Sequence, residues 1–179
     1  MIKLDNFAIE KQQTPYTCAY ASVSMVTSFL GSRADEETVL NEFPPGFLGA
    51  TPSKIVKAFN KYLPGFTVSY EIKRKKNLLS FIEVKLKDGI PVPFIYLTVD
   101  HFNKPHLTSH YSVITGIDTE NKKLIIANPF GYEQVTDINE MLKSMAFKTK
   151  GPMPFVLKLA IFLKVLRGYM VFDIARTRK

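Results

Sequence analysis

The spacing of apolar residues changes near residue 65 of this 179-residue chain, and that change restricts the fold class. Before it, apolar positions recur at helical spacing, which predicts helices over 18–30, 35–43 and 51–62. After it, apolar and polar residues alternate over 66–72, which predicts a strand, and further strands are expected over 91–99, 110–117 and 123–128. Two further helices are expected over 77–87 and 136–147. Helices first and antiparallel strands second are typical of an α+β domain.

Residues 155–166 form an almost wholly apolar stretch, interrupted only by Lys158 and Lys164. A helix this apolar is either buried or lies against another surface. One interpretation is a core helix followed by an edge strand over 168–174. The other is an interfacial membrane helix or dimer contact over 154–167, whose cations would meet anionic headgroups. We expect residues 1–150 to form the main domain and 151–179 to pack on it as an extension.

The net charge of +8 comes from lysines spread along the chain. Without Gly-rich loops, zinc-ligand spacings or a basic stripe interleaved with aromatics, nucleic acid is not an expected partner. The single cysteine excludes an intramolecular disulfide. The N-terminal residues do not resemble a signal peptide, and no run reaches the roughly 20 apolar residues that span a bilayer. We therefore expect a cytoplasmic protein, with signal-less secretion or peripheral membrane attachment as alternatives.

Three residues form the pattern of a cysteine nucleophile site. Cys18 stands at the start of the first predicted helix, His110 opens an apolar strand, and Asn128 closes the next strand. A helix N-terminus and a neighbouring imidazolium both favour thiolate, so Cys18 and His110 are expected to rest as an ion pair. Asn128 would hold the imidazole ring, while Gln12 and the backbone N–H of Cys18 would donate to an oxyanion.

Each residue also has a structural interpretation. A lone cysteine on an apolar helix is usually a small buried hydrophobe, and Asn128-Pro-Phe-Gly alone is a turn. Gln13 competes with Gln12 for the oxyanion role, and the spacing to the cysteine favours Gln12. His101, His106 and His110 lie within ten residues and could ligate zinc. No cysteine accompanies them, so we expect neither metal nor cofactor, and a loop whose histidines meet substrate.

Taken in order, these motifs resemble cysteine peptidase family 39. This papain-type branch includes the bacterial double-glycine leader peptidases attached to bacteriocin exporters. The resemblance spans roughly Phe7 to Met145. It rests on Gln12 with Cys18, on Ala50-Thr-Pro-Ser-Lys-Ile-Val-Lys-Ala-Phe-Asn-Lys-Tyr62, on Gly89-Ile-Pro-Val-Pro93, on His110-Tyr-Ser-Val-Ile-Thr-Gly-Ile-Asp118, and on Asn128-Pro129.

The resemblance implies a papain-like fold, with N-terminal helices packed on an antiparallel β-sheet. It also implies roles: Cys18 as nucleophile, His110 as base and acid, Asn128 as orienting residue and Gln12 as oxyanion donor. The chain departs from the family pattern where Asp-Cys-Gly becomes Thr17-Cys18-Ala19, and where Asn128 replaces the usual Asp. Asparagine orients imidazole without adding negative charge, which weakens the stabilisation of imidazolium.

The predicted function is cleavage of a peptide or amide bond in a peptide or protein substrate, through an acyl-enzyme on Cys18. A glutamine deamidase or an acyltransferase would use the same four residues, because only the acyl donor and the acceptor differ. A non-catalytic binding module of the same fold is the third alternative. Retaining Cys18, His110, Asn128 and Gln12 together favours an enzyme, since a docking surface needs none of them.

Overall fold

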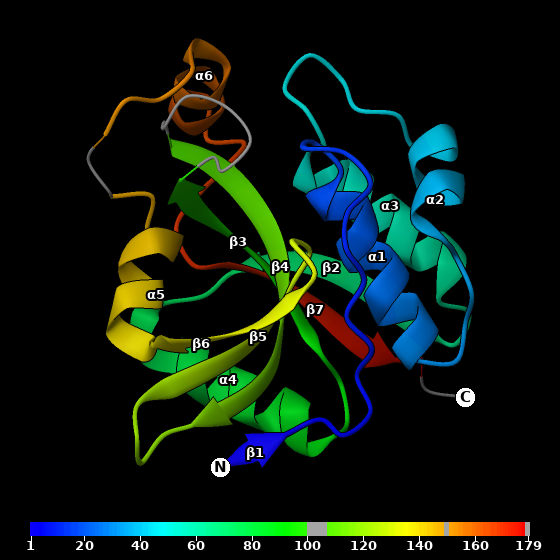
Figure 1. Ribbon diagram of the computed structural model, residues 1–179, viewed down its shortest axis with the longest axis vertical. Coiled ribbons are helices and arrows are strands. Elements are labelled where there is room, and N and C mark those ends of the chain that lie inside the picture. Colours follow the sequence, from blue (N-terminus) through cyan, green and yellow to red (C-terminus); the bar gives the residue numbers. More distant parts are fainter. Residues whose placement is uncertain (100–106, 149–150, 178–179) are drawn as a thin grey trace.

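The computed structural model describes residues 1–99, 107–148 and 151–177. Within them, a seven-stranded antiparallel sheet carries helices on both faces (Figure 1). Its main path runs β2-β7-β3-β4-β5-β6, and β1 pairs with β4 outside that path. The strands are β1 (Ile2–Lys3), β2 (Phe66–Ile72), β3 (Val92–Val99), β4 (Leu107–Asp118), β5 (Lys123–Asn128), β6 (Tyr132–Asp137) and β7 (Met170–Arg176).

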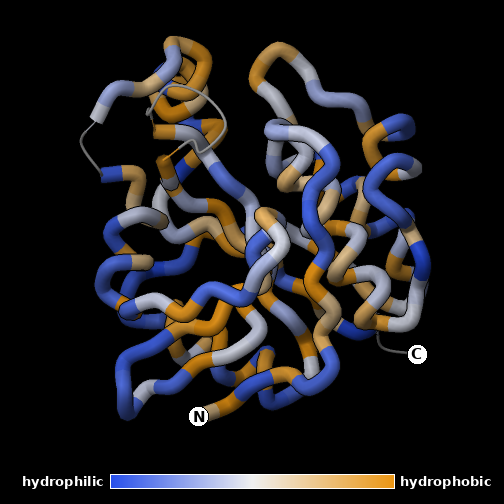
Figure 2. Tube along the Cα trace, in the orientation of Figure 1, coloured by the Kyte–Doolittle hydropathy of each residue, from blue (hydrophilic) through white to orange (hydrophobic). Residues whose placement is uncertain are grey.

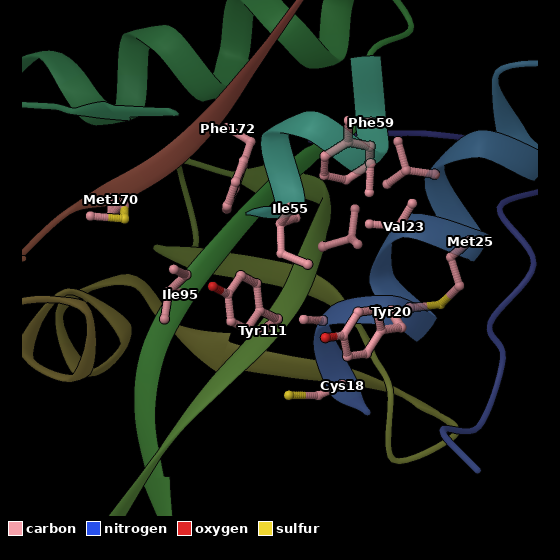
Figure 3. Packing of buried hydrophobic residues seen from close by; sticks show 14 of the residues in the cluster. Cys18, Tyr20, Val23, Met25, Ile55, Phe59, Ile95, Tyr111, Met170 and Phe172 are labelled. Atoms are coloured by element: carbon pink, nitrogen blue, oxygen red, sulfur yellow. The ribbon is translucent and has the colours of Figure 1, made fainter. Parts of the chain in front are cut away.

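Three helices from the first third of the chain cover one face of the sheet (Figure 1). They are α1 (Cys18–Phe29), α2 (Glu36–Glu42) and α3 (Pro52–Tyr62). Ten of the twelve residues of α1 are buried, so this helix is the centre of the layer. Its apolar side chains pack with those of α3 and of the sheet, including Phe59, Tyr111 and Phe172 (Figure 3).

The opposite face is covered by α4 (Lys75–Lys87) and α5 (Ile138–Met145). Because neighbouring residues of a strand point to opposite faces, β4 contributes to both layers. Tyr111 and Val113 pack with the α1 layer, whereas Ile114 packs with the α4 layer. The predicted α+β class, with N-terminal helices on an antiparallel sheet, is confirmed.

The C-terminal residues differ from the sequence prediction in two ways. The helix α6 (Phe155–Phe162) ends four residues early, and Lys164 just beyond it adopts a positive φ of 56°. The strand β7 was expected at the edge of the sheet, and that prediction is wrong. It lies between β2 and β3, where Val171 and Ile174 are completely buried. Burial on both faces explains its apolar Met170-Val-Phe sequence.

The strand β6 was not predicted, because its sequence Tyr-Glu-Gln-Val-Thr-Asp is mostly polar and lies at the sheet edge, where none of its residues is buried. It pairs with β5 from Lys123↔Asp137 to Asn128↔Tyr132. The turn between them therefore starts at Asn128, and Gly131 N–H donates to Asn128 O at 2.9 Å. Gly131 has a φ of +93°, a conformation that favours glycine.

Candidate active site

The segment before α1 is held between the β5–β6 turn and α2. Gln12 N–H donates to the carbonyl of Pro129 at 2.7 Å, and Lys11 forms an isolated bridge with Phe130. The next amide, that of Gln13, donates to the carboxylate of Glu36 at 3.0 Å. These bonds place Gln12 beside the Asn128 turn, although the two lie more than a hundred residues apart in sequence.

The first turn of α1 has no side-chain cap. Thr17 occupies the N-cap position, but its hydroxyl donates back to the carbonyl of Thr14 at 3.1 Å. The same hydroxyl accepts the Thr14 N–H at 3.1 Å. The first N–H groups of any helix lack intrahelical acceptors. The N–H groups of Ala19 and Tyr20, from which an N-cap side chain ordinarily accepts, therefore donate no hydrogen bond to the Thr17 side chain.

His110 and Asn128 are hydrogen-bonded, with His110 Nε2 3.0 Å from Asn128 Oδ1. Two other bonds fix the orientation of the asparagine amide. Phe130 N–H donates to Oδ1 at 3.0 Å, and Nδ2 donates to Gln134 Oε1 at 2.8 Å. Since Oδ1 is an acceptor, Nε2 of His110 must be the donor. A neutral imidazole then carries its lone pair on Nδ1.

The imidazole ring of His110 is also positioned by aromatic neighbours. The Phe130 ring stacks on it, with centroids 4.4 Å apart and planes at 26°. Tyr96 meets it edge-on, at 5.6 Å and 83°. His110 is only 3% exposed, so the ring is held by packing as well as by Asn128. Such packing removes the rotamer freedom that would weaken a catalytic base.

Cys18 and His110 line the same cavity, which has a volume of about 160 Å³. The other walls come from the α2–α3 loop, the start of β4, Phe130, and the Val165–Leu166 segment after α6. Asn128 is not part of the lining, and it is 1% exposed. The cavity is thus shaped by parts of the chain from residue 15 to residue 166.

Gln12 is not among the residues that line this cavity. Its side chain is buried, whereas Gln13, the competing candidate, is exposed. Gln12 Nε2 donates to the carbonyl of Thr14 at 2.6 Å, and the buried Oε1 has no hydrogen-bond partner. An unpaired buried oxygen is uncommon and costs free energy. The amide is therefore held at the turn that leads into Cys18.

Burial raises the pKa of the Cys18 thiol from its ordinary value of 9.0 to about 11. Backbone N–H groups, that of Tyr111 first, lower the pKa, and the Glu36 carboxylate raises it. This burial opposes the expected thiolate–imidazolium ion pair, because it disfavours the charged thiolate. The physical reason is desolvation, because Cys18 lies at the edge of an apolar cluster beside Tyr20 and Tyr111 (Figure 3).

A resting thiol of this kind should react slowly with iodoacetamide. With a pKa of about 11, the thiolate fraction at pH 7 is about 100-fold lower than at a pKa of 9.0. The alkylation rate should rise about tenfold per unit from pH 7 to 10, because alkali produces the thiolate. Intact mass spectrometry measures the rate, and the unfolded chain is the control. Rapid reaction at pH 6 that is lost in His110→Ala would instead indicate an ion pair.

The zinc alternative involves three histidines, of which only His110 lies among the described residues. His101 and His106 lie outside the described residues, and His110 bonds to Asn128. Among the described residues, no group of three His, Cys, Asp or Glu could hold a metal ion. Among these described residues, no helix is long and apolar enough to cross a membrane.

The structure adds three residues around His110 and Asn128 that the sequence reasoning missed: Phe130, Gln134 and Tyr96. The turn after Asn128 offered one signal, since a chain that reverses at Gly131 brings the next strand back beside Asn128. Because β6 is polar, its sequence did not indicate a strand. Gln134, which lies on that strand, was therefore not identified as a neighbour of Asn128. Tyr96 comes from β3, and nothing in its local sequence indicates contact with His110.

Comparison with known proteins identifies the family. The model of the Peptidase C39-like family matches residues 4–149, which agrees with the resemblance over Phe7 to Met145. The chain belongs to the Peptidase C39-like family. No curated protein matches it. Residues 151–179 lie outside the matched range, so α6 and β7 are not covered by the family model.

Solved structures support the same papain-like fold at low sequence identity. A protein from Bacillus anthracis described as a C39-like peptidase has a TM-score of 0.69 at 14% identity, over 99% of this chain and 98% of that one. The peptidase domain of Streptococcus ComA, a bifunctional ABC transporter of a quorum-sensing pathway, has a TM-score of 0.65 at 16% identity, over 96% and 100%. A double-glycine-motif protease of an AMS/PCAT transporter, solved with its leader peptide, has a TM-score of 0.57 at 14% identity, over 99% of each chain.

Proposed function

We propose that this C39-like chain is a cysteine hydrolase that cleaves a peptide or amide bond through an acyl-enzyme on Cys18. The observation that carries the proposal is the cavity that Cys18 shares with His110, whose ring is held by Asn128 at 3.0 Å. A peptide substrate is supported by the double-glycine-motif protease, which was solved with a leader peptide. The order of the three residues along the chain and the His110–Asn128 bond support such chemistry.

His110 acts as a general base in this proposal, because the resting thiol is neutral. As the Cys18 sulfur attacks the substrate carbonyl carbon, its proton passes to His110 Nδ1. The resulting imidazolium gives that proton to the leaving amine, and a thioester remains on Cys18. A water molecule, deprotonated by His110, then hydrolyses the thioester and frees the thiol. Asn128 keeps Nε2 as the hydrogen-bond donor throughout, which leaves Nδ1 as the basic nitrogen.

The oxyanion would be stabilised by the backbone N–H of Cys18 and by the Gln12 side chain. As the first residue of α1, Cys18 has a backbone N–H without an intrahelical acceptor. Gln12 Nε2 carries two hydrogens and gives one to Thr14, so the second remains for substrate. Loss of one oxyanion donor typically costs about 2.7–4 kcal/mol of transition-state stabilisation.

One observation favours the alternative of a non-catalytic binding module. A thiol with a pKa of about 11 is inert by itself, as in a structural cysteine. The enzyme hypothesis requires His110 to activate this thiol once substrate occupies the cavity. Activity and its dependence on His110 therefore separate the two functions.

The test uses a proteome-derived peptide library incubated with the wild-type chain and with His110→Ala. New peptide termini are read by mass spectrometry, while released ammonia and transfer to an added amine are measured in parallel. We expect new termini from the wild type and at least about a 1,000-fold lower rate from His110→Ala. Ammonia or amine transfer without cleavage would indicate a deamidase or an acyltransferase. A wild-type chain without any of these activities would contradict the enzyme hypothesis.

A further inference from the structure

The helix α6 leaves an apolar face uncovered. Leu157 and Ala160 are buried against the domain, whereas Phe155 and Phe162 are 73% and 80% exposed. Leu163, just after the helix, is 53% exposed. Scattered exposed apolar residues are common, but two exposed phenylalanines two turns apart on the same side of one helix, with Leu163 beside them, indicate an interaction site. Figure 2 shows the hydrophobic character of this helix at one end of the molecule.

A cation stands within this apolar face. At 100° per residue, Phe155, Lys158 and Phe162 project within about 60° of one another. Lys158 is exposed, so its ammonium lies on the same side of α6 as the two rings. The loop that follows adds exposed Lys164 and Arg167, joined by a 2.8 Å bond from Arg167 Nε to the Lys164 carbonyl. Among the described residues, none of these three cations forms an ion pair.

The charge of the surrounding sequence is strongly one-sided. Residues 141–172 contain none of the chain's 16 acidic residues. They contain six of its 24 lysines and arginines: Lys143, Lys148, Lys150, Lys158, Lys164 and Arg167. Most of the net charge of +8 therefore arises here. Paired copies of this surface would bring like charges together, which disfavours a symmetric dimer.

We propose that α6 with Lys164 and Arg167 is a docking surface for an anionic lipid bilayer. Exposed phenylalanines beside lysines and arginines are the residue types that interfacial helices place at the boundary of headgroups and acyl chains. Phe155 and Phe162 enter that boundary, and the three cations meet lipid phosphates. The positive charge of these cations favours an anionic lipid surface over a neutral or basic binding partner.

This surface adjoins the candidate active site. Val165 and Leu166, in the loop that follows α6, form part of the cavity wall. The opposite wall includes the α2–α3 loop, where Phe47 is 77% exposed. Figure 1 shows α6 and this loop projecting from the same end of the molecule. Docking through α6 would therefore hold the cavity walls close to the lipid surface.

The test is co-sedimentation of the full chain with vesicles of phosphatidylcholine, with or without phosphatidylglycerol. We expect binding to the anionic vesicles that weakens about fivefold for each cation removed, so on the order of 100-fold in Lys158→Gln/Lys164→Gln/Arg167→Gln. Phe155→Ser/Phe162→Ser should also weaken binding at least about tenfold. Matched controls on exposed positions of α4, β5 and β6, Lys87→Gln/Lys123→Gln and Val84→Ser/Val135→Ser, should leave binding within about twofold.

Three results would overturn the proposal: no binding to anionic vesicles, equal binding to neutral ones, or equal effects of the control variants. If sedimentation velocity showed a dimer that Phe155→Ser/Phe162→Ser dissociates, the occupant would be a second copy instead. Cys18→Ala should bind vesicles like the wild type, so this inference can fail or hold independently of the proposed activity. Deleting residues 151–179 cannot serve as the test, because it removes the internal strand β7.

Discussion

Cys18→Ala should abolish hydrolysis, lowering the rate by at least about 10⁴-fold, while the chain stays folded. The thioester cannot form without the sulfur, and no second cysteine can replace it. The fold should survive because Cys18 borders the cavity and alanine is the best helix former. The measurement is kcat/KM on any peptide that the wild type cleaves, with circular dichroism and thermal unfolding on the same samples.

Ser22→Ala is the matched control for this substitution. Ser22 lies one turn further along α1 and donates its hydroxyl to the Cys18 carbonyl at 2.8 Å. Like Cys18→Ala, the Ser22→Ala substitution removes one buried side-chain atom from α1, but it leaves the Cys18 sulfur in place. This variant should retain most of the activity. Full activity in Cys18→Ala, or equal losses in both variants, would contradict the assignment of Cys18 as nucleophile.

The second large effect is expected from a charge clash at Asn128 and Gln134. Asn128→Asp alone should keep activity within about tenfold, because Gln134 can rotate its amide and donate Nε2 to the new carboxylate. Gln134→Glu alone should do likewise, because its carboxylate still accepts from Asn128 Nδ2. Together, the two carboxylates would face each other without a donor between them where the present bond is 2.8 Å, and the Tyr96 hydroxyl near Asn128 Nδ2 could offset only part of this repulsion. We expect turnover of the double variant to fall at least about 100-fold at pH 7.

The kinetic readout for this pair is kcat of the wild type, the two single variants and the double variant. A positioning role predicts strong non-additivity, because each single change leaves one donor and one acceptor. Simple addition of two small losses would mean that Gln134 does not position Asn128. Thermal unfolding of the double variant separates a misplaced imidazole from a chain that no longer folds.

Much of the fold could be predicted because local signals agreed with the tertiary structure. Asp35 and Asp137 cap α2 and α5 through their side chains, and apolar periodicity located α1 and α3. Local sequence signals did not predict the strand β6 or the position of β7 within the sheet. The first is a polar edge strand defined only by its pairing with β5. The position of β7 in the sheet depends on pairing with β2, about a hundred residues earlier.

The candidate site could be predicted as a set of residues but not as an electrostatic environment. The order of Cys18, His110 and Asn128 along the chain pointed to a site, and the His110–Asn128 contact agrees with it. The pKa of Cys18 depends on desolvation by side chains from other elements, which no local motif reveals. The same holds for Glu36, whose carboxylate receives the Gln13 amide from a different part of the chain.

The central claim is that Cys18 becomes acylated by a peptide substrate, and acid quenching tests this most directly. Wild-type chain is mixed with a peptide that it cleaves, quenched within the first turnover at low pH, and analysed by intact mass and peptide mapping. We predict a thioester adduct on Cys18 with the mass of the acyl half of the peptide, absent from Cys18→Ala. Cleavage of the peptide with Cys18 unmodified throughout, or an adduct on another residue, would contradict the account.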